Sequence, residues 1–165
     1  MTLHRRQRKP PEPRADLAMA RLGRYQFRHQ TPSGVALMSP AGPRYTLGIT
    51  ALIFVIIGVG FLLVPVSWAA SVDIVLPTAM ARTDLRATYG GFDLAFGLFL
   101  ARCAHRPEWH AAGLYAAAMV LAGFGLSRLS GLVIEGSLDP FMWKLLAVEL
   151  PVAGLCTWLY RRVRA

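Results

Sequence analysis

Cysteine and acidic residues are both scarce in this sequence. Only two of the 165 residues are cysteine, Cys103 and Cys156, and they are 53 positions apart. A disulfide framework needs several paired cysteines, and a zinc site needs clustered cysteine or histidine ligands, so neither is indicated. We therefore expect no metal site, and we expect both cysteines to be small packing residues.

Acidic residues number 9 against 18 lysines and arginines, which gives a formal net charge of +9. Such a charge can indicate nucleic-acid binding. Here, however, the basic residues gather at the N-terminus, in one short loop and at the C-terminus, and not along one folded face. This distribution is typical of membrane topology, and we expect no nucleic-acid partner.

Charge is absent from long stretches of the chain, whereas hydrophobic residues make up 55% of it. No charged residue occurs between Tyr45 and Val72, and about 20 apolar residues suffice to cross a bilayer as a helix. Asp139-Pro140 reads as an N-cap followed by a first-turn proline. The sequence predicts an all-α, integral membrane four-helix bundle over residues 45–162, with spans at about 45–66, 86–104, 109–132 and 140–160.

Residues 1–44 are rich in arginine, proline and glycine, and we predict a disordered basic cytoplasmic tail. The tail could bind anionic lipid headgroups. With four spans, fourteen of the 18 lysines and arginines lie on the side of the termini. The positive-inside rule then places both termini in the cytoplasm, with the protein in the cell inner membrane.

Charged side chains inside the predicted spans are costly in a bilayer and usually face the interior of a bundle. Counting from the helix ends places two acids and two bases in the outer half of the membrane. The predicted intramembrane polar cluster consists of Arg86, Tyr89, Asp93, Arg128, Lys144 and Glu149. It is either a buried ion-pair network that fixes the register of the helices, or a polar pocket or proton site centred on Glu149.

Small residues share helical faces with these charges, which favours close helix packing. The candidate packing residues are Gly90, Gly91, Gly97, Ala118, Ala122 and Gly125. We predict that the small-residue faces of the second, third and fourth spans meet.

The four histidines, His4, His29, His105 and His110, all lie outside the predicted membrane depth. This position argues against a histidine-ligated haem or pigment inside the bundle. We expect surface histidines and no cofactor.

The run from Asp84 to Phe99, which contains Arg86-x-x-Tyr89-Gly90-Gly91, is the most distinctive segment of the chain. Together with Arg128 and Glu149 it resembles a bacterial family, domain of unknown function 4345, over roughly residues 45–162. The resemblance implies a compact four-helix inner-membrane protein. It also implies that these polar and glycine residues share one role, but it does not imply any particular activity.

No catalytic constellation is visible in the sequence, so an enzyme is the less favoured class. We expect a non-enzymatic accessory or scaffold subunit that binds a membrane-protein partner or forms a homo-oligomer within the lipid bilayer. The alternative is a small oligomeric transporter or proton-coupled permease that uses Asp93, Arg128 and Glu149. A membrane enzyme acting on a lipid or quinone ranks last.

Overall fold

The computed structural model describes residues 41–136 and 139–165, which belong to one compact unit that begins at Met38. These residues are helical apart from short connections, and no strand occurs among them. The predicted all-α class is therefore confirmed for the described residues. The predicted tail, including its lipid-binding role, lies outside them except for residues 41–44, which begin the first described helix.

Within the described residues, three helical segments are long and apolar enough to cross a membrane, Ala41–Leu63, Pro107–Glu135 and Pro140–Arg164. They correspond to helix α2 (Ala41–Leu63), to the short η3 (Pro107–Trp109) continued by α6 (His110–Glu135), and to α7 (Pro140–Arg164). Their length and composition mark the chain as a membrane protein. The first helix begins four residues before the predicted span and carries Arg44 in its first turn.

The predicted second span corresponds to part of a longer helical segment. Helix α4 (Ala79–Leu85) runs directly into a π-helical turn, η2 (Arg86–Gly91), and then into α5 (Phe92–His105). Thr78 begins this segment because its hydroxyl accepts a hydrogen bond from the backbone N–H of Ala81 at 3.1 Å. The connection between α2 and this segment contains a short helix, α3 (Pro65–Ala70).

The remaining helix ends follow from local chemistry. Helix α5 ends at His105, and Arg106 adopts an extended conformation ahead of Pro107. Gly136 ends α6 in the left-handed conformation, with φ at 60°. The predicted N-cap of α7 is confirmed, since the Oδ1 atom of Asp139 accepts hydrogen bonds from the N–H groups of Phe141 at 2.8 Å and Met142 at 2.9 Å.

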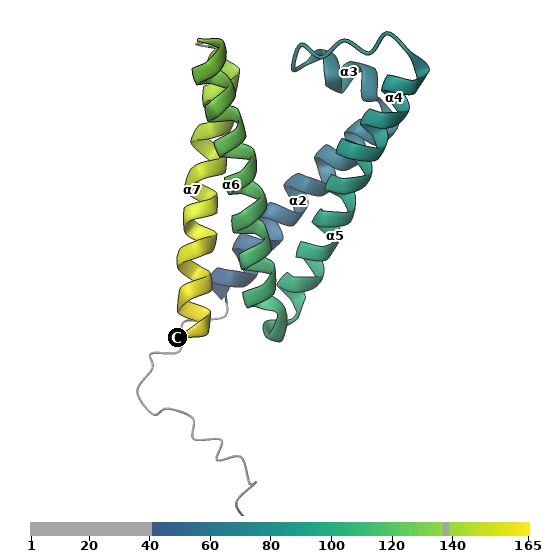
Figure 1. Cartoon of the computed structure of the whole chain (residues 1–165). Coiled ribbons are helices and arrows are strands. Elements are labelled where there is room, and N and C mark those ends of the chain that lie inside the picture. Colours follow the sequence, from purple (N-terminus) through teal and green to yellow (C-terminus); the bar gives the residue numbers. More distant parts are fainter. Residues whose placement is uncertain (1–40, 137–138) are drawn as a thin grey trace, which may run out of the picture. The chain divides into compact units, whose positions relative to one another are not determined.

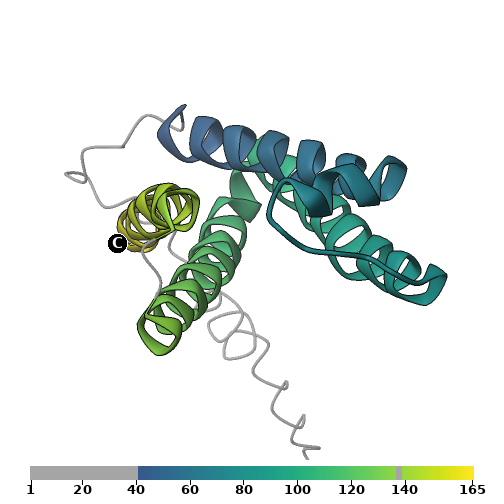
Figure 2. The same cartoon turned by 90° about the horizontal axis from the view of Figure 1, so that it is seen from above.

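The helices pack as two hairpins, α2 with α5 and α6 with α7. Figures 1 and 2 show that the hairpins lie together at the end formed by the α5–α6 turn and diverge towards α3 and α4. In the α2–α5 hairpin, a Cβ on Gly97 would lie 2.8 Å from the backbone nitrogen of Val55, so glycine permits this close approach.

The buried core reflects this arrangement. One cluster joins all four long elements near the α5–α6 turn and includes Leu47, Leu100, Leu114 and Cys156. Both cysteines are fully buried there, as expected for packing residues. A second, smaller cluster joins only α2, α3 and α4, through Phe61, Ala69 and Leu85. The two hairpins therefore share a core at one end only.

Candidate functional site

A salt bridge joins the two hairpin partners α6 and α7. The Nε atom of Arg128 donates to both carboxylate oxygens of Glu149, at 3.0 and 3.1 Å. The Glu149 side chain is 11% exposed and that of Arg128 is 32% exposed. The pair therefore lies at the edge of the helix interface, where the charge of the arginine offsets that of a nearly buried carboxylate.

Small residues on α6 bring the two helices close enough for this pair. A Cβ on Gly125 would lie 2.6 Å from Cδ2 of Leu150, the residue after Glu149. Ala118 is buried on the same helix, and Ala122 is half-buried. The backbone of α7 can thus approach α6 just where a charged pair has to be held in register.

The guanidinium of Arg128 is only partly used by this pair. An arginine side chain carries five N–H donors. Besides the bonds from Nε, the described residues offer only a weak sulfur acceptor, Sδ of Met142, at 3.9 Å from Nη1. Donors at the end of the side chain are therefore available to another acceptor.

Asp93 is buried separately, in the first turn of α5 in the other hairpin. The residue is 6% exposed, and it makes no hydrogen bond or ion pair with any described residue. It lies two positions after the end of the π-helical turn η2. Burial of an acid without a partner disfavours the charged form, and π-helical turns occur frequently at functional sites.

The remaining members of the predicted polar cluster lie apart from these groups. The Nε atom of Arg86 donates to the backbone oxygen of Leu62 at 3.1 Å, and the ring of Tyr89 lies 5.2 Å from that of Phe61. Lys144 is exposed and has no hydrogen bond or ion pair with the described residues. Of the six predicted residues, only Arg128 and Glu149 are brought into contact with each other.

The small-residue faces also pair differently from the prediction. Gly90 and Gly97 on the helical segment before the turn pack against α2, where added Cβ atoms would meet Leu62 and Val55 at 2.8 Å. They do not meet the small-residue face of α6, which packs against α7. Gly91 has open surroundings, since an added Cβ would meet only the backbone oxygen of Arg86, at 3.7 Å.

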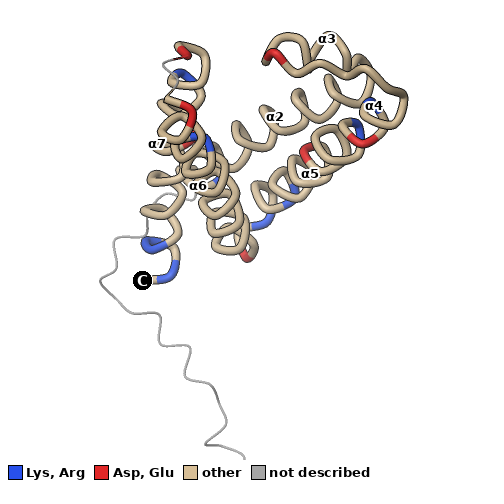
Figure 3. Tube along the Cα trace, turned by 45° about the horizontal axis from the view of Figure 1, so that its top comes forward, with Lys and Arg blue, Asp and Glu red and all other residues tan. Residues whose placement is uncertain are grey.

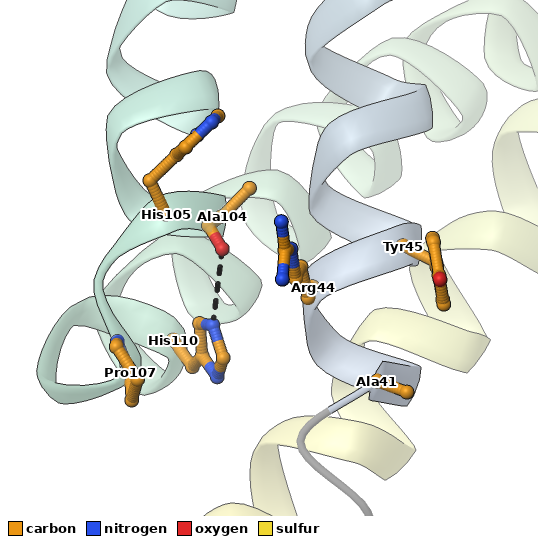
Figure 4. Close-up of a pocket in the computed structure, with 7 residues that line it drawn as sticks. All are labelled: Ala41, Arg44, Tyr45, Ala104, His105, Pro107 and His110. Atoms are coloured by element: carbon orange, nitrogen blue, oxygen red, sulfur yellow. Dashed lines mark hydrogen bonds between the residues drawn. The ribbon is translucent and has the colours of Figure 1, made fainter.

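The sequence did not predict a pocket that lies beside the α5–α6 turn, at the opposite end of the helices from Arg128 and Asp93. The pocket has a volume of about 330 Å³ and is shown in Figure 4. Its lining consists of Ala41, Arg44, Tyr45, Ala104, His105, Pro107 and His110. The prediction of a surface histidine is wrong for His110, which is 5% exposed. A signal in the sequence was the occurrence of Arg44, His105 and His110 close to helix ends, in the first turn of α2, the last turn of α5 and at the start of α6.

No group of three or more histidine, cysteine, aspartate or glutamate side chains within 41–136 and 139–165 could hold a metal ion. Comparison with known proteins adds a family but no activity. Searches of the curated proteins and of the solved structures each found no match. A family described as "Domain of unknown function (DUF4345)" matches residues 43–160. Since the match covers most of the sequence and all the long helices described above, the chain belongs to this family.

Proposed function

We propose that the chain is a non-enzymatic accessory or scaffold subunit of an assembly in the bacterial inner membrane. In this proposal it crosses the membrane four times, with α4, η2 and α5 together supplying the second crossing, and both termini lie in the cytoplasm. The distribution of charge supports this orientation: Figure 3 shows basic positions at the C-terminal ends of α5 and α7, which lie at the same end of the unit.

The observation that carries the proposal is the partly satisfied guanidinium of Arg128. Arg128 lies seven residues before the end of α6, about 10 Å along the helix axis, which is within membrane depth. Hydrocarbon supplies no acceptors for its remaining donors, and intramembrane charges are normally paired inside a bundle. A neighbouring membrane protein can supply the acceptor.

The test is purification of the full chain from its native membrane in mild detergent, followed by mass measurement of the intact complex. We expect a second protein to co-purify with the natural chain and to be lost from Arg128→Gln. The matched control is Lys144→Gln, which removes an exposed charge that has no described partner. Recovery of the natural chain without any other protein would overturn the accessory role.

A second candidate function, an oligomeric transporter or proton-coupled permease, is favoured by one observation, the buried and unpartnered Asp93. Four helices are few for a transport pathway, so a homodimer would be needed. In proteoliposomes containing the purified chain, a proton gradient should then drive a pH change that Asp93→Asn abolishes while the helical content is preserved. Proton movement that persists in Asp93→Asn would remove this candidate.

The orientation is tested separately. Reporter tags fused at Met1 and Ala165 should both report a cytoplasmic location. Tags on opposite sides of the membrane would mean an odd number of crossings and would contradict the four-span topology, whatever partner the chain binds.

A further inference from the structure

The pocket beside the α5–α6 turn is built where three helical elements end. Ala41, Arg44 and Tyr45 come from the first turns of α2, Ala104 and His105 from the last turn of α5, and His110 from the start of α6. Figure 4 shows Arg44 and His110 directed towards the space beside Ala104, with the ring of His105 turned away at the rim. Two nitrogen-bearing side chains from different hairpins thus face one cavity.

Among the described residues, the side-chain charge at this pocket is positive and has no acidic partner. Arg44 makes no hydrogen bond or ion pair with any described residue, and no acidic residue lines the cavity. The acid nearest in sequence, Glu108, lies 3.9 Å from Arg106 in an exposed ion pair. The N-terminal ends of α2 and α6 contribute the positive ends of two helix dipoles, and the C-terminal end of α5, which also lines the pocket, contributes a negative one.

The ring of His110 is held in place inside the pocket wall. The residue is 5% exposed, and its Nε2 atom lies 3.4 Å from the backbone oxygen of Ala104. This contact fixes the ring against the end of α5. The pocket therefore combines a fixed imidazole with a free guanidinium, whose planar donors match phosphate oxygens in two-point hydrogen bonds.

The surroundings of the pocket indicate where such a phosphate comes from. Tyr45, Ile49 and Leu52 are spaced by one turn along α2 and are 68%, 61% and 60% exposed. Together they form an apolar strip that runs from the pocket along a helix long enough to cross a membrane. A tyrosine beside an arginine at a helix end is typical of the level where headgroups meet acyl chains.

We propose that this pocket binds a phosphate group, and that the group is carried by an anionic lipid headgroup whose acyl chains lie along the Tyr45–Leu52 strip. Arg44 supplies the charge and the paired donors, and His110 forms the wall opposite. The site belongs to the helical unit and is distinct from any binding by the basic residues of the N-terminal segment.

The test is native mass spectrometry of the full chain in detergent, with phosphatidylglycerol or phosphatidylcholine of identical acyl chains added. We expect the chain to retain phosphatidylglycerol in preference. Arg44→Gln should weaken that retention about fivefold, which corresponds to about 1 kcal/mol for one basic residue at a membrane surface. Arg44→Lys should retain more phosphatidylglycerol than Arg44→Gln but less than the natural chain, because lysine keeps the positive charge and lacks the planar guanidinium.

Two matched controls separate the pocket from general positive charge. Arg161→Gln removes an exposed arginine from the last turn of α7, at the same end of the unit, and should leave retention unchanged. Neutralising Arg5, Arg6 and Arg8 together removes three charges from the N-terminal segment and should change retention less than Arg44→Gln alone. Equal losses in Arg44→Gln and Arg161→Gln would overturn the pocket.

A competition arm identifies the source of the phosphate. Inorganic phosphate should not displace the retained phosphatidylglycerol, because it lacks the acyl chains. If it binds with the same dependence on Arg44 and displaces the lipid, a phosphate site stands but the lipid assignment is wrong. If the natural chain retains both lipids equally, the anionic headgroup site is refuted.

Discussion

Replacing Gly58 with alanine should destabilise the α2–α5 hairpin, whereas the same change at Gly48 should not. A Cβ on Gly58 would lie 2.8 Å from Cα of Leu94 and 2.9 Å from the backbone oxygen of Gly90, with the nitrogen of Leu94 closer still. These neighbours are backbone atoms, so relief requires the helices to separate. A Cβ on Gly48, in the same helix, would meet nothing within 4 Å.

The two substitutions should change the free energy of unfolding in opposite directions. Overpacking a tight interface costs about 1–3 kcal/mol, and alanine improves on glycine in a helix interior by up to about 1 kcal/mol. We therefore expect Gly58→Ala to lower the free energy of unfolding by about 1–2 kcal/mol. Gly48→Ala meets no steric clash and gains only the better helix propensity of alanine, so it should raise the free energy of unfolding by up to about 1 kcal/mol.

The measurement is thermal unfolding of the full chains, purified in one detergent and followed by circular dichroism. A lower midpoint for Gly58→Ala and an equal or higher one for Gly48→Ala would support the close packing of α2 on α5. If both variants gain stability together, the backbones do not approach at Gly58 and the reasoning is refuted.

Three further predictions concern polar groups. Glu149→Leu alone should destabilise the chain by about 1–3 kcal/mol because it leaves the half-buried Arg128 without its carboxylate, and adding Arg128→Met should recover most of that loss; a double-variant loss equal to the sum of the Glu149→Leu and Arg128→Met losses would mean that the two residues are not coupled. Asp93→Asn should raise the unfolding midpoint, since a buried acid without a partner is costly, whereas the exposed control Asp84→Asn should not, and a lower midpoint for Asp93→Asn would reveal an unrecognised partner. Asp139→Ala should cost about 1 kcal/mol by removing the N-cap of α7, and an unchanged denaturant midpoint would contradict that role.

The helical segments could be predicted because their signals are local. Uncharged apolar runs predicted the long helices, and the Asp139-Pro140 pair predicted the start of α7 within its own few residues. The π-helical turn could not be predicted, since its extra residue per turn has no distinct sequence pattern. The first helix also begins earlier than predicted, because a charged residue does not have to lie outside a helix, and Arg44 is an exposed residue in its first turn.

The pairing of helices was harder to predict than their existence. Position along a helix fixes depth, so Arg128 and Glu149 could both be placed in the outer half of the membrane. The same argument placed Asp93 with them, but depth does not say which neighbour a face contacts. A face of glycine and alanine residues does not identify the helix that it contacts. The small-residue face of α5 packs on α2 and not on α6. The pocket at Arg44 could not be predicted for a related reason, because it forms only where the ends of separate helices come together.

The pairing of each long helix with the next one along the chain bears on how the protein is made. Ribosomal synthesis delivers α2 and α5 before α6 exists, so the first hairpin can complete its whole contact surface while the second is still being translated. The connection between α6 and α7 is short, which keeps the search for their contacts local and fast, whereas the connection between α2 and α5 is longer and contains α3 and α4. The second hairpin and the core near the α5–α6 turn both have to wait for the residues of α7 to emerge.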